Sequence, residues 1–495
     1  MNVWSPPSSA VLNRDAIMFI ENRLYFCPLS SPPPPTHPLQ TCIVPPPTTQ
    51  NHPLHPSLSN NEKNTTTTNT NSKIRDTSTP VIFLRTDSRS DGRYHYQPFF
   101  SDFGPCDLGA VYRFCDEIDE ILKHTDPKQR IVHCVHKNNP KARSNGAFLT
   151  AAYCVLRLAW SAQQAFAPLL GIYPPIVPFR DASYGLCTYT ITVYDCLKSL
   201  QKAIKGGLFG NPSMFDSQSY SHYSRVENGD WHWIIKNKLL ACSGPHNQRR
   251  TCVPRKKHFN YEAEKGDKKK IDSIKEEGEK EKDVKTEEDT SGSGSDANKA
   301  MKVTKVMLSA EDYALLFVEK GISNVVRLND PTTYDKTIFM KHNIAHQDMY
   351  FTDGSVPTSS LVSQFIQTMD SAKGAVAVHC KAGLGRTGTM ASAYLMHKYH
   401  FTAKESIAWI RIVHPGSIVG PQQHYLERLQ PQLHSAHSRN NAKHKQSRYQ
   451  QHQQQRNVLL SHSGSIAPSP LLYETEYGGG GGGHSGGGRS TMSMS

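Results

Sequence analysis

Residues 374–388, GAVAVHCKAGLGRTG, predict a strand, a tight loop and a helix in direct succession, and this order decides the fold of the region. Gly383 and Gly385 allow backbone conformations in which several amide N–H groups point at one position. Arg386 then opens a helix, whose first turn offers free N–H donors and a field that favours an anion. The stretch therefore predicts a cradle for a dianion, with Cys380 at its base. Six residues are expected to form this cradle: Lys381, Ala382, Gly383, Leu384, Gly385 and Arg386.

The residue types in the loop point to nucleophilic attack on phosphorus. Amide groups, the helix field and a nearby guanidinium can lower the pKa of a cysteine thiol from about 8.5 into roughly the 3.5–7.5 range, which would make Cys380 a thiolate nucleophile. Arg386 follows six residues later, and its planar fork can hold two phosphoryl oxygens. In-line attack would then give a phosphocysteine intermediate. Thr387 is placed to donate a hydrogen bond to the sulfur, and His379 to orient the loop from behind.

The spacing His-Cys-x5-Arg-Thr, after an apolar strand and before a helix, is specific for this chemistry. A buried cysteine that merely lies beside a loop glycine is the weaker alternative. Because Arg386 and the loop amides supply the positive field, no metal and no other cofactor is expected at Cys380.

The proton donor for the leaving oxygen is less well determined. The segment DMYFTDGSVPTS (348–359) carries Asp353, followed by Gly354 and Pro357, and is expected to form a mobile loop. An acid on such a loop can close over the substrate and protonate the ester oxygen. Alternatively, Asp353 begins a turn, for which the pair Asp-Gly is well suited. The residues by themselves support both interpretations equally.

Composition predicts globular regions separated by polar segments. Three segments of low complexity, 29–78, 247–300 and 434–495, are too polar to bury a core and are expected to be disordered. Part of the net charge of +13 lies in such polar stretches, above all at 434–456, where charge runs mainly solvate the chain, so a nucleic-acid partner is not expected.

Cysteine usage and apolar runs narrow the protein class. The 11 cysteines include no Cys-x-x-Cys pair, which argues against a zinc site and a disulfide framework and fits a reduced, intracellular compartment. No run of 18 apolar residues occurs, and the N-terminus lacks a basic region followed by an apolar core. Neither a transmembrane helix nor a secretory signal is therefore predicted, and no membrane partner is expected.

A second His-Cys pair suggests a duplicated domain. RIVHCV (130–135) is typical of a strand, and a helical stretch follows at 142–160, so the order of strand, His-Cys, loop and helix occurs twice. In the first copy, the residue six positions after Cys134 is Pro140, and the nearest arginine, Arg143, is out of register for a phosphate clamp. Cys134 is therefore interpreted as a structural residue. Three basic residues near it, Lys137, Lys141 and Arg143, are expected to face an acidic groove or solvent.

The segment HCKAGLGRTG (379–388) resembles the signature of the protein tyrosine and dual-specificity phosphatases. Further stretches resemble the cell-division-cycle-fourteen phosphatases within that superfamily: NRLYF (22–26), FSDFGP (100–105), VPFRDASYGLCTY (177–189), RVENGDWHWI (225–234), SGPH (243–246), VVRLND (325–330), FTDGSVPT (351–358) and IRIVHPGSIVGPQQHYL (410–426).

This resemblance implies an α/β fold with two tandem dual-specificity-phosphatase-like domains, each a central mixed sheet flanked by helices, of which only the second is active. The expected boundaries are an inactive domain at 15–205, a linker helix region at 206–225, a catalytic domain at 226–433 and a tail at 434–495.

The resemblance also implies roles for residues and substrates. Asp353 corresponds to the general acid, and Gln422 and Gln423 correspond to a glutamine loop near the attacking water, without a decision between the two. Implied partners are proteins phosphorylated on serine or threonine before proline, together with phosphotyrosine, in cell-cycle and mitotic-exit control. The stretch 215–224 holds one acid, Asp216, so a preference for a basic residue after the proline is expected to be weaker.

Two other functions compete with this interpretation. A phosphoinositide phosphatase would carry a second lysine where Leu384 stands, and a phosphopeptide-binding scaffold would not require Cys380, Arg386 and Asp353 together. The basic clusters RKKH (255–258) and KKK (268–270) are compatible with nuclear import or with a solvated linker. The family resemblance favours the nucleus, with cytoplasmic or spindle- and centrosome-associated pools.

Overall fold

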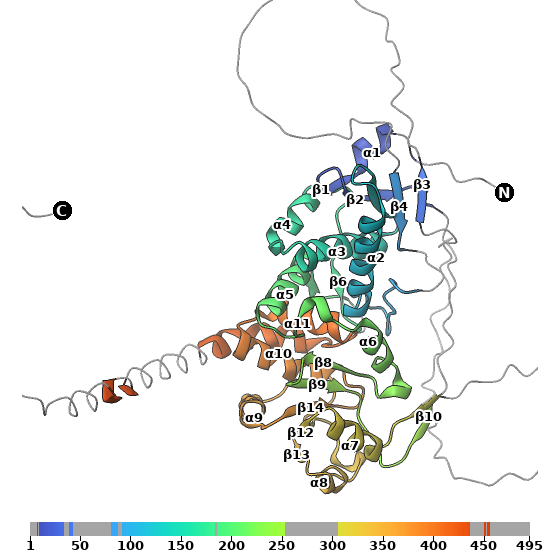
Figure 1. Cartoon of the computed structure of the whole chain (residues 1–495). Helices are drawn as coiled ribbons and strands as arrows, with labels where there is room; N and C mark the ends of the chain where they lie inside the picture. Colours follow the sequence, from blue (N-terminus) through green and yellow to red (C-terminus); the bar gives the residue numbers. More distant parts are fainter. Residues whose placement is uncertain are drawn as a thin grey trace, which may run out of the picture. The chain divides into compact units, whose positions relative to one another are not determined.

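The computed structural model describes residues 7, 9–33, 39–42, 81–87, 92–183, 186–252, 305–435, 450–451 and 453–455. The described residues up to 435 belong to one compact unit (Figure 1). Residues 450–451 and 453–455 are helical and belong to a second unit, Ser438–Ser495.

The first domain contains a mixed sheet whose five strands are, in spatial order, β1 (Ile17–Ile20), β2 (Leu24–Leu29), β5 (Arg130–His136), β4 (Val81–Arg85) and β3 (Leu39–Cys42). The three inner strands are parallel, and the two edge strands pair in antiparallel fashion. Its other elements are α1 (Ser9–Asp15), α2 (Leu108–His124), α3 (Pro140–Arg157), α4 (Ala162–Phe166), β6 (Phe179–Arg180), β7 (Thr190–Ile191) and α5 (Val193–Lys205).

The second domain contains a mixed sheet in the order β13 (Ala345–Asp348), β12 (Ile322–Arg327), β14 (Ala375–His379), β9 (Leu239–Cys242) and β8 (Trp231–Ile235). Only β8 is antiparallel to its neighbour. Its other elements are β10 (Arg250–Cys252), β11 (Lys305–Met307), α7 (Ala310–Glu319), α8 (Thr337–Lys341), α9 (Ser359–Ser371), α10 (Gly385–Tyr399), α11 (Ala403–Val413) and a helix at 421–435. The predicted fold, two α/β domains with mixed sheets, is confirmed.

Local sequence signals explain where the helices around the two central strands begin. Asn139 caps α3 through its side chain and Pro140 occupies the first turn, where a missing N–H costs nothing. Thr402 and Glu405 form a reciprocal capping box at the start of α11. Both devices satisfy backbone donors that would otherwise be buried without a partner.

One large hydrophobic cluster extends across both domains. In Figure 1, α5 of the first domain lies beside α11 of the second, and Lys202 on α5 pairs with Glu405 on α11 at 2.7 Å. Trp409 on α11 is fully buried, and its ring stacks on Phe209 of the linker with centroids 5.5 Å apart. Because the interface is apolar and continuous with both cores, the linker region, with α6 (Ser217–Tyr223), is part of the same folded body.

Three predicted segment boundaries differ from the structure. Residues 39–42, placed in the 29–78 insertion, form strand β3 at the sheet edge, and β2 extends to Leu29. Residues 250–252, placed in the 247–300 insertion, form β10, which pairs with β11. Residues 434–435, placed in the tail, still belong to the helix that begins at 421. Each short element takes its order from a partner strand or preceding helix, which local composition does not reveal.

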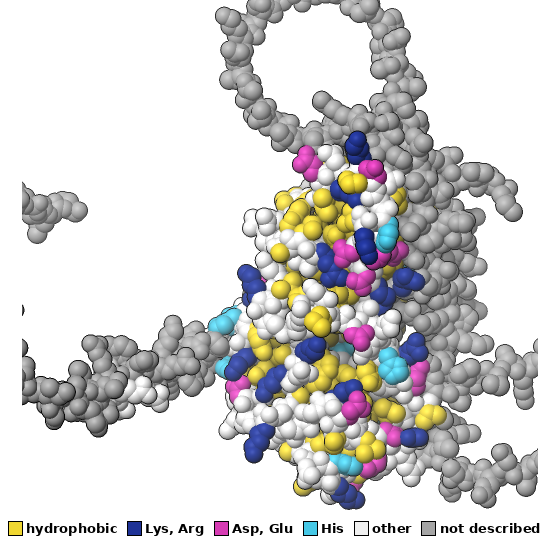
Figure 2. Space-filling model, viewed as in Figure 1, with side chains coloured by type: hydrophobic (Ala, Val, Ile, Leu, Met, Phe, Trp, Pro, Cys, Tyr) yellow, Lys and Arg dark blue, Asp and Glu magenta, His cyan; other side chains and the backbone are white. Residues whose placement is uncertain are grey.

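The surface shows mixed charge. On the face drawn in Figure 2, lysine and arginine side chains alternate with acidic ones and form no continuous basic stripe. Within the described ranges, no helix is long and apolar enough to cross a bilayer.

Candidate active site

The loop after β14 places Cys380 where the central strand of the second domain ends. The strand stops at His379, Cys380 follows with 3% of its surface exposed, and α10 begins at Gly385. Gly383 has φ +71°, and a Cβ atom there would lie 2.4 Å from the carbonyl oxygen of Cys242, so only glycine fits this approach. Among the described residues, nothing accepts a hydrogen bond from the backbone N–H groups of residues 381–385. The loop thus presents unused donors at a helix N-terminus, as an anion cradle requires.

Arg386 and Asp353 meet at this loop. Nη1 of Arg386 donates to the carbonyl oxygens of Leu328, at 3.3 Å, and Phe351, at 3.0 Å. Its Nε lies 3.2 Å from Oδ1 of Asp353. The arginine side chain is 4% exposed, whereas the Asp353 side chain is 71% exposed. The guanidinium is therefore fixed by two carbonyls, while the carboxylate stays open to a substrate.

Thr387 is fully buried at the start of α10, but the predicted hydrogen bond to the Cys380 sulfur is not formed. Its Oγ1 has no hydrogen-bond partner among the described residues. A buried hydroxyl without a partner is costly and rare, so this group is free for a charge that develops beside it.

The structure separates the two glutamines that the sequence left undecided. Oε1 of Gln422 accepts a hydrogen bond from the backbone of Val419 at 3.1 Å, and its Nε2 donates to the carbonyl of Ser355 at 3.1 Å, in the loop that carries Asp353. A Cβ atom at Gly385 would lie 3.0 Å from Gln422 Oε1. Gln423 instead points to Arg411, whose Nη2 donates to its Oε1 at 2.7 Å. Gln422 is therefore the glutamine that lies between the loop that carries Asp353 and the loop that follows Cys380.

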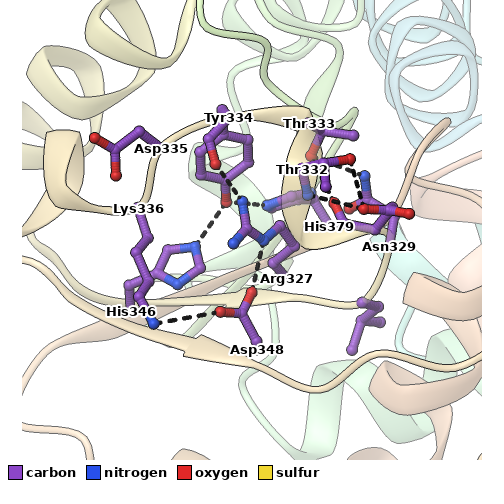
Figure 3. A network of polar contacts seen from close by, with 12 residues as sticks. Arg327, Asn329, Thr332, Thr333, Tyr334, Asp335, Lys336, His346, Asp348 and His379 are labelled. Atoms are coloured by element: carbon purple, nitrogen blue, oxygen red, sulfur yellow. Dashed lines mark hydrogen bonds and ion pairs between the residues drawn. The ribbon is translucent and has the colours of Figure 1, made fainter.

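His379 supports the loop through a chain of hydrogen bonds (Figure 3). Its Nδ1 lies 3.2 Å from the carbonyl oxygen of Cys380, which can only accept, so Nδ1 carries the proton. Burial lowers the pKa of His379 to about 3, so the ring is neutral and its Nε2 accepts from the Tyr334 hydroxyl at 2.7 Å. That hydroxyl in turn accepts from Nε2 of His346 at 2.8 Å. In this series of hydrogen bonds, from His346 through Tyr334 to His379, every proton points toward the backbone of Cys380.

Arg327 holds Tyr334, the middle residue of this hydrogen-bond series, in place. It is 2% exposed, its Nε contacts Oδ1 of Asp348 at 2.6 Å, and its Nη1 donates to the carbonyl of Tyr334 at 2.6 Å. Its guanidinium also lies over the Tyr334 ring, 4.3 Å from the centroid (Figure 3). Sequence analysis missed Arg327, Tyr334, His346 and Asp348 as supporting residues. An arginine and an aspartate at the ends of two neighbouring strands, β12 and β13, were the available signal.

The first domain contains a related arrangement without the loop. His133 on β5 is fully buried between the hydroxyls of Thr86 and Thr150, each 2.7 Å away, and burial lowers its pKa to about 3. Cys134 also lies inside β5, its thiol contacts the carbonyl of Leu84 at 3.5 Å, and burial raises its pKa well above the ordinary value. Arg143 is 3% exposed and donates to the carbonyl of Pro174. These side chains form no open cradle.

Of the three basic residues near Cys134, Lys141 is exposed to solvent, Lys137 is partly exposed, and Arg143 is buried, against expectation. Lys137 lies 3.5 Å from Asp15, and Lys141 lies over the ring of Phe103 at 5.7 Å. Within the described part of the chain, no cluster of three metal-ligating side chains occurs.

Two family models match this chain: the N-terminal half of dual specificity protein phosphatases at residues 65–203, and the dual specificity phosphatase catalytic domain at 319–431. The dual specificity protein phosphatase CDC14A of Mus musculus is 39% identical over 340 residues, which cover 68% of this chain and 48% of that protein. CDC14B of the same organism is 36% identical over 344 residues, 69% of this chain and 60% of that protein. The tyrosine-protein phosphatase CDC14 homolog of Schizosaccharomyces pombe is 35% identical over 340 residues, 68% and 54% respectively. The chain spans less than two thirds of the length of each of these relatives.

Proposed function

Because the chain belongs to the CDC14 family of dual specificity phosphatases, we propose that it hydrolyses phosphoserine, phosphothreonine and phosphotyrosine in proteins, through a phosphocysteine at Cys380. The observation that carries this proposal is the meeting of Cys380, Arg386 and Asp353 at one loop with unused N–H donors. A scaffold that only binds phosphopeptides would need neither the thiol nor the acid.

In the first step, the thiolate of Cys380 attacks phosphorus opposite the leaving oxygen. The loop N–H groups and the Arg386 guanidinium hold the non-bridging oxygens, where negative charge is stabilised. As the S–P bond forms and the P–O ester bond breaks, Asp353 gives its proton to the leaving oxygen. The open position of Asp353, beside the guanidinium that holds the phosphate, suits this transfer.

In the second step, a water molecule attacks the phosphocysteine. Asp353, now a carboxylate, accepts a proton from the water, the S–P bond breaks, and inorganic phosphate leaves together with the regenerated thiolate. Gln422 lies beside both Ser355, in the loop that carries Asp353, and Gly385, which supports a role for its side-chain amide in orienting the water. The unpaired hydroxyl of Thr387 is available to donate to the departing sulfur.

For substrate choice, the proposal is preference for serine or threonine before proline, in proteins that control the cell cycle. The support is the resemblance of the stretches around both domains to the CDC14 phosphatases, and the CDC14 names of the matched relatives. Asp216 already accepts two hydrogen bonds from the first turn of α6, which supports a weak preference for a basic residue after the proline. Nuclear location remains a proposal from the same resemblance, and the basic clusters at 255–258 and 268–270 lie outside the described residues.

A panel of matched phosphopeptides tests the proposal. We expect hydrolysis of Ser-Pro and Thr-Pro peptides to exceed that of the same peptides with alanine after the phosphorylated residue, with phosphotyrosine also hydrolysed. Cys380→Ser is the matched inactive control and should release no phosphate. Retained activity in that variant would exclude the thiolate mechanism, and preference for phosphotyrosine without proline would overturn the proposed substrate class.

A further inference from the structure

The turn at residues 416–420, which precedes Gln422, has a strained backbone. Gly416, Ile418 and Gly420 all have positive φ angles, of +80°, +63° and +54°. Positive φ is easy for glycine but costly for a β-branched residue such as isoleucine. Such a conformation persists only where surrounding contacts hold it in place.

Arg411 supplies the contacts from the catalytic domain itself. This side chain is 3% exposed, and its Nε donates to the carbonyl of Ser417 at 3.0 Å. Its Nη2 donates to the carbonyl of Ile418 at 2.8 Å and to Oε1 of Gln423 at 2.7 Å. These bonds fix the first half of the turn directly. In the described part of the chain, the second half is hydrogen-bonded to α11 only through Gln423, whose Nε2 donates to the carbonyl of Gly420 at 3.2 Å.

A direct anchor for the backbone N–H of the second half comes from the first domain. Oδ2 of Asp181 accepts a hydrogen bond from the backbone N–H of Gly420 at 2.6 Å, and Asp181 is 3% exposed. The residues are 239 positions apart in sequence. The ring of Phe99, also from the first domain, packs on Gly416 so closely that a Cβ atom there would lie 2.3 Å from it. The buried carboxylate also interacts favourably with the Arg411 guanidinium, which joins both anchors.

Gln422 depends on this turn for its position. Its backbone N–H donates to the carbonyl of Val419 at 3.3 Å, and its Oε1 accepts from the N–H of Val419 at 3.1 Å. Gly420 therefore lies inside a closed local ring of hydrogen bonds that includes the glutamine side chain. A shift of Gly420 moves Gln422 away from Gly385 and from the carbonyl of Ser355, and misplacement of about 1 Å can cost roughly a hundredfold in rate.

We propose that Asp181, in the domain without a complete site, is a positioning residue for the attack of water on phosphocysteine. It acts by holding Gly420, and through that residue Gln422, with Phe99 as a second support on the same turn. This inference rests on the proposed function and assigns the first domain a part in one of the two chemical steps. Asp181 does not touch the reacting atoms.

The test measures the two steps separately in the full chain. Rapid mixing with an aryl phosphate gives the rate of aryl alcohol release, which reports phosphocysteine formation. Quenching at set times after mixing with an aryl phosphate that carries a radiolabelled phosphoryl group gives the amount of phosphoenzyme and its rate of decay. We expect Asp181→Ala to slow decay by about tenfold or more, with formation changed less than about twofold, so that phosphoenzyme accumulates. Because the burst amplitude counts only competent enzyme, partial unfolding does not imitate this result.

Three further variants sharpen the test. Asp181→Asn keeps an oxygen that can accept from Gly420 and should restore decay to within about threefold of wild type. Phe99→Ala, at a half-exposed side chain, should slow the same step by a smaller factor and serves if Asp181→Ala does not fold. Lys202→Ala removes a contact between the domains that is remote from the turn, and should leave decay unchanged.

A double substitution links the effect to the glutamine. If Asp181 acts through Gln422, then Asp181→Ala combined with Gln422→Ala should be no slower in decay than Gln422→Ala by itself. Additive losses, or wild-type decay in both Asp181→Ala and Phe99→Ala, would overturn the inference while leaving the proposed function intact. Failure of the wild-type protein to form any phosphocysteine would instead overturn the proposed function.

Discussion

The two His-Cys pairs of this protein lie on matching central strands, yet only one is followed by a cradle. In each sheet, the strand with the pair runs parallel to a neighbour on either side, and the histidine is buried against a hydroxyl group. In the first domain, β5 continues through Cys134 to His136. In the second, β14 stops at His379, so Cys380 begins a loop. The His-Cys pair is therefore not sufficient to form the site. The thiol faces a cradle only where the strand ends before the cysteine.

The position of each arginine follows from this difference. Arg386 is the second residue of α10, and its guanidinium reaches the loop that precedes the helix. Arg143 lies one turn into α3, which begins with Pro140, and its guanidinium is committed to the carbonyl of Pro174. A positive charge near a cysteine is thus insufficient unless, as for Arg386, it lies at the loop that follows the cysteine, beside an exposed acid.

Replacing each arginine with lysine tests most directly whether Arg386 and Arg143 have different roles. Arg386→Lys should lower kcat/KM for an aryl phosphate at least about a hundredfold, because lysine cannot hold two phosphoryl oxygens in one plane. Arg143→Lys should leave kcat/KM within about twofold of wild type. Steady-state kinetics with both variants checks this, and comparable losses in the two would show that the first domain takes part in phosphate binding directly.

The two histidines should, by contrast, be equal in their effect on acid stability. Burial lowers the pKa of His133 and of His379 to about 3, against an ordinary value of about 6.5. The unfolded chain therefore binds protons that the folded chain does not, so stability is full above about pH 6.5 and falls as the pH drops toward 3. Each ring should account for about 2 kcal/mol of the loss between pH 7 and pH 5.

Urea unfolding at pH 7 and pH 5 measures these contributions. His133→Gln and His379→Gln should each reduce the difference between the two pH values by about the same amount, although only His379 adjoins the site. A variant that loses as much stability on acidification as wild type would show that its histidine is not held neutral by burial.

The smallest effect is expected from the hydroxyl groups that pair with the histidines. Tyr334→Phe leaves Nε2 of His379 without a donor, and Thr86→Val does the same for His133, so each should cost about 1–3 kcal/mol of unfolding free energy. Only Tyr334→Phe should also lower kcat, by a few fold, because its chain ends on the backbone of Cys380. Denaturant titration and kinetics on both proteins separate the two roles, and an equal loss of kcat in Thr86→Val would contradict the contrast.

Sequence reasoning succeeded where the chemistry is local. The strand, Cys380, the glycines and Arg386 fall within one short stretch, so spacing by itself predicts their geometry, and the structure places them together. Asp353 required the family resemblance, because nothing within its own segment shows that it meets Arg386 at 3.2 Å. The resemblance also gave the correct family and the mixed sheets of both domains.

The remaining features depend on contacts between distant segments. Successive residues on a helix point about 100° apart, so the choice between Gln422 and Gln423 follows from packing against Ser355 and Arg411. The hydrogen bonds from His346 through Tyr334 to His379 join strand β13, the segment before α8 and strand β14. The hydrogen bond from Gly420 to Asp181 joins the two domains. β3 forms in a Pro- and Thr-rich stretch because an edge of the sheet is available there, which composition does not show.

The β10–β11 ladder has a practical consequence for protein engineering. It pairs Cys252 with Lys305, so the two ends of the intervening sequence lie on adjacent strands, which are about 5 Å apart. A segment with its ends fixed so closely can be shortened or exchanged with little change in loop-closure entropy. A fluorescent reporter or a purification handle inserted between Cys252 and Lys305 is therefore expected to leave both central sheets intact.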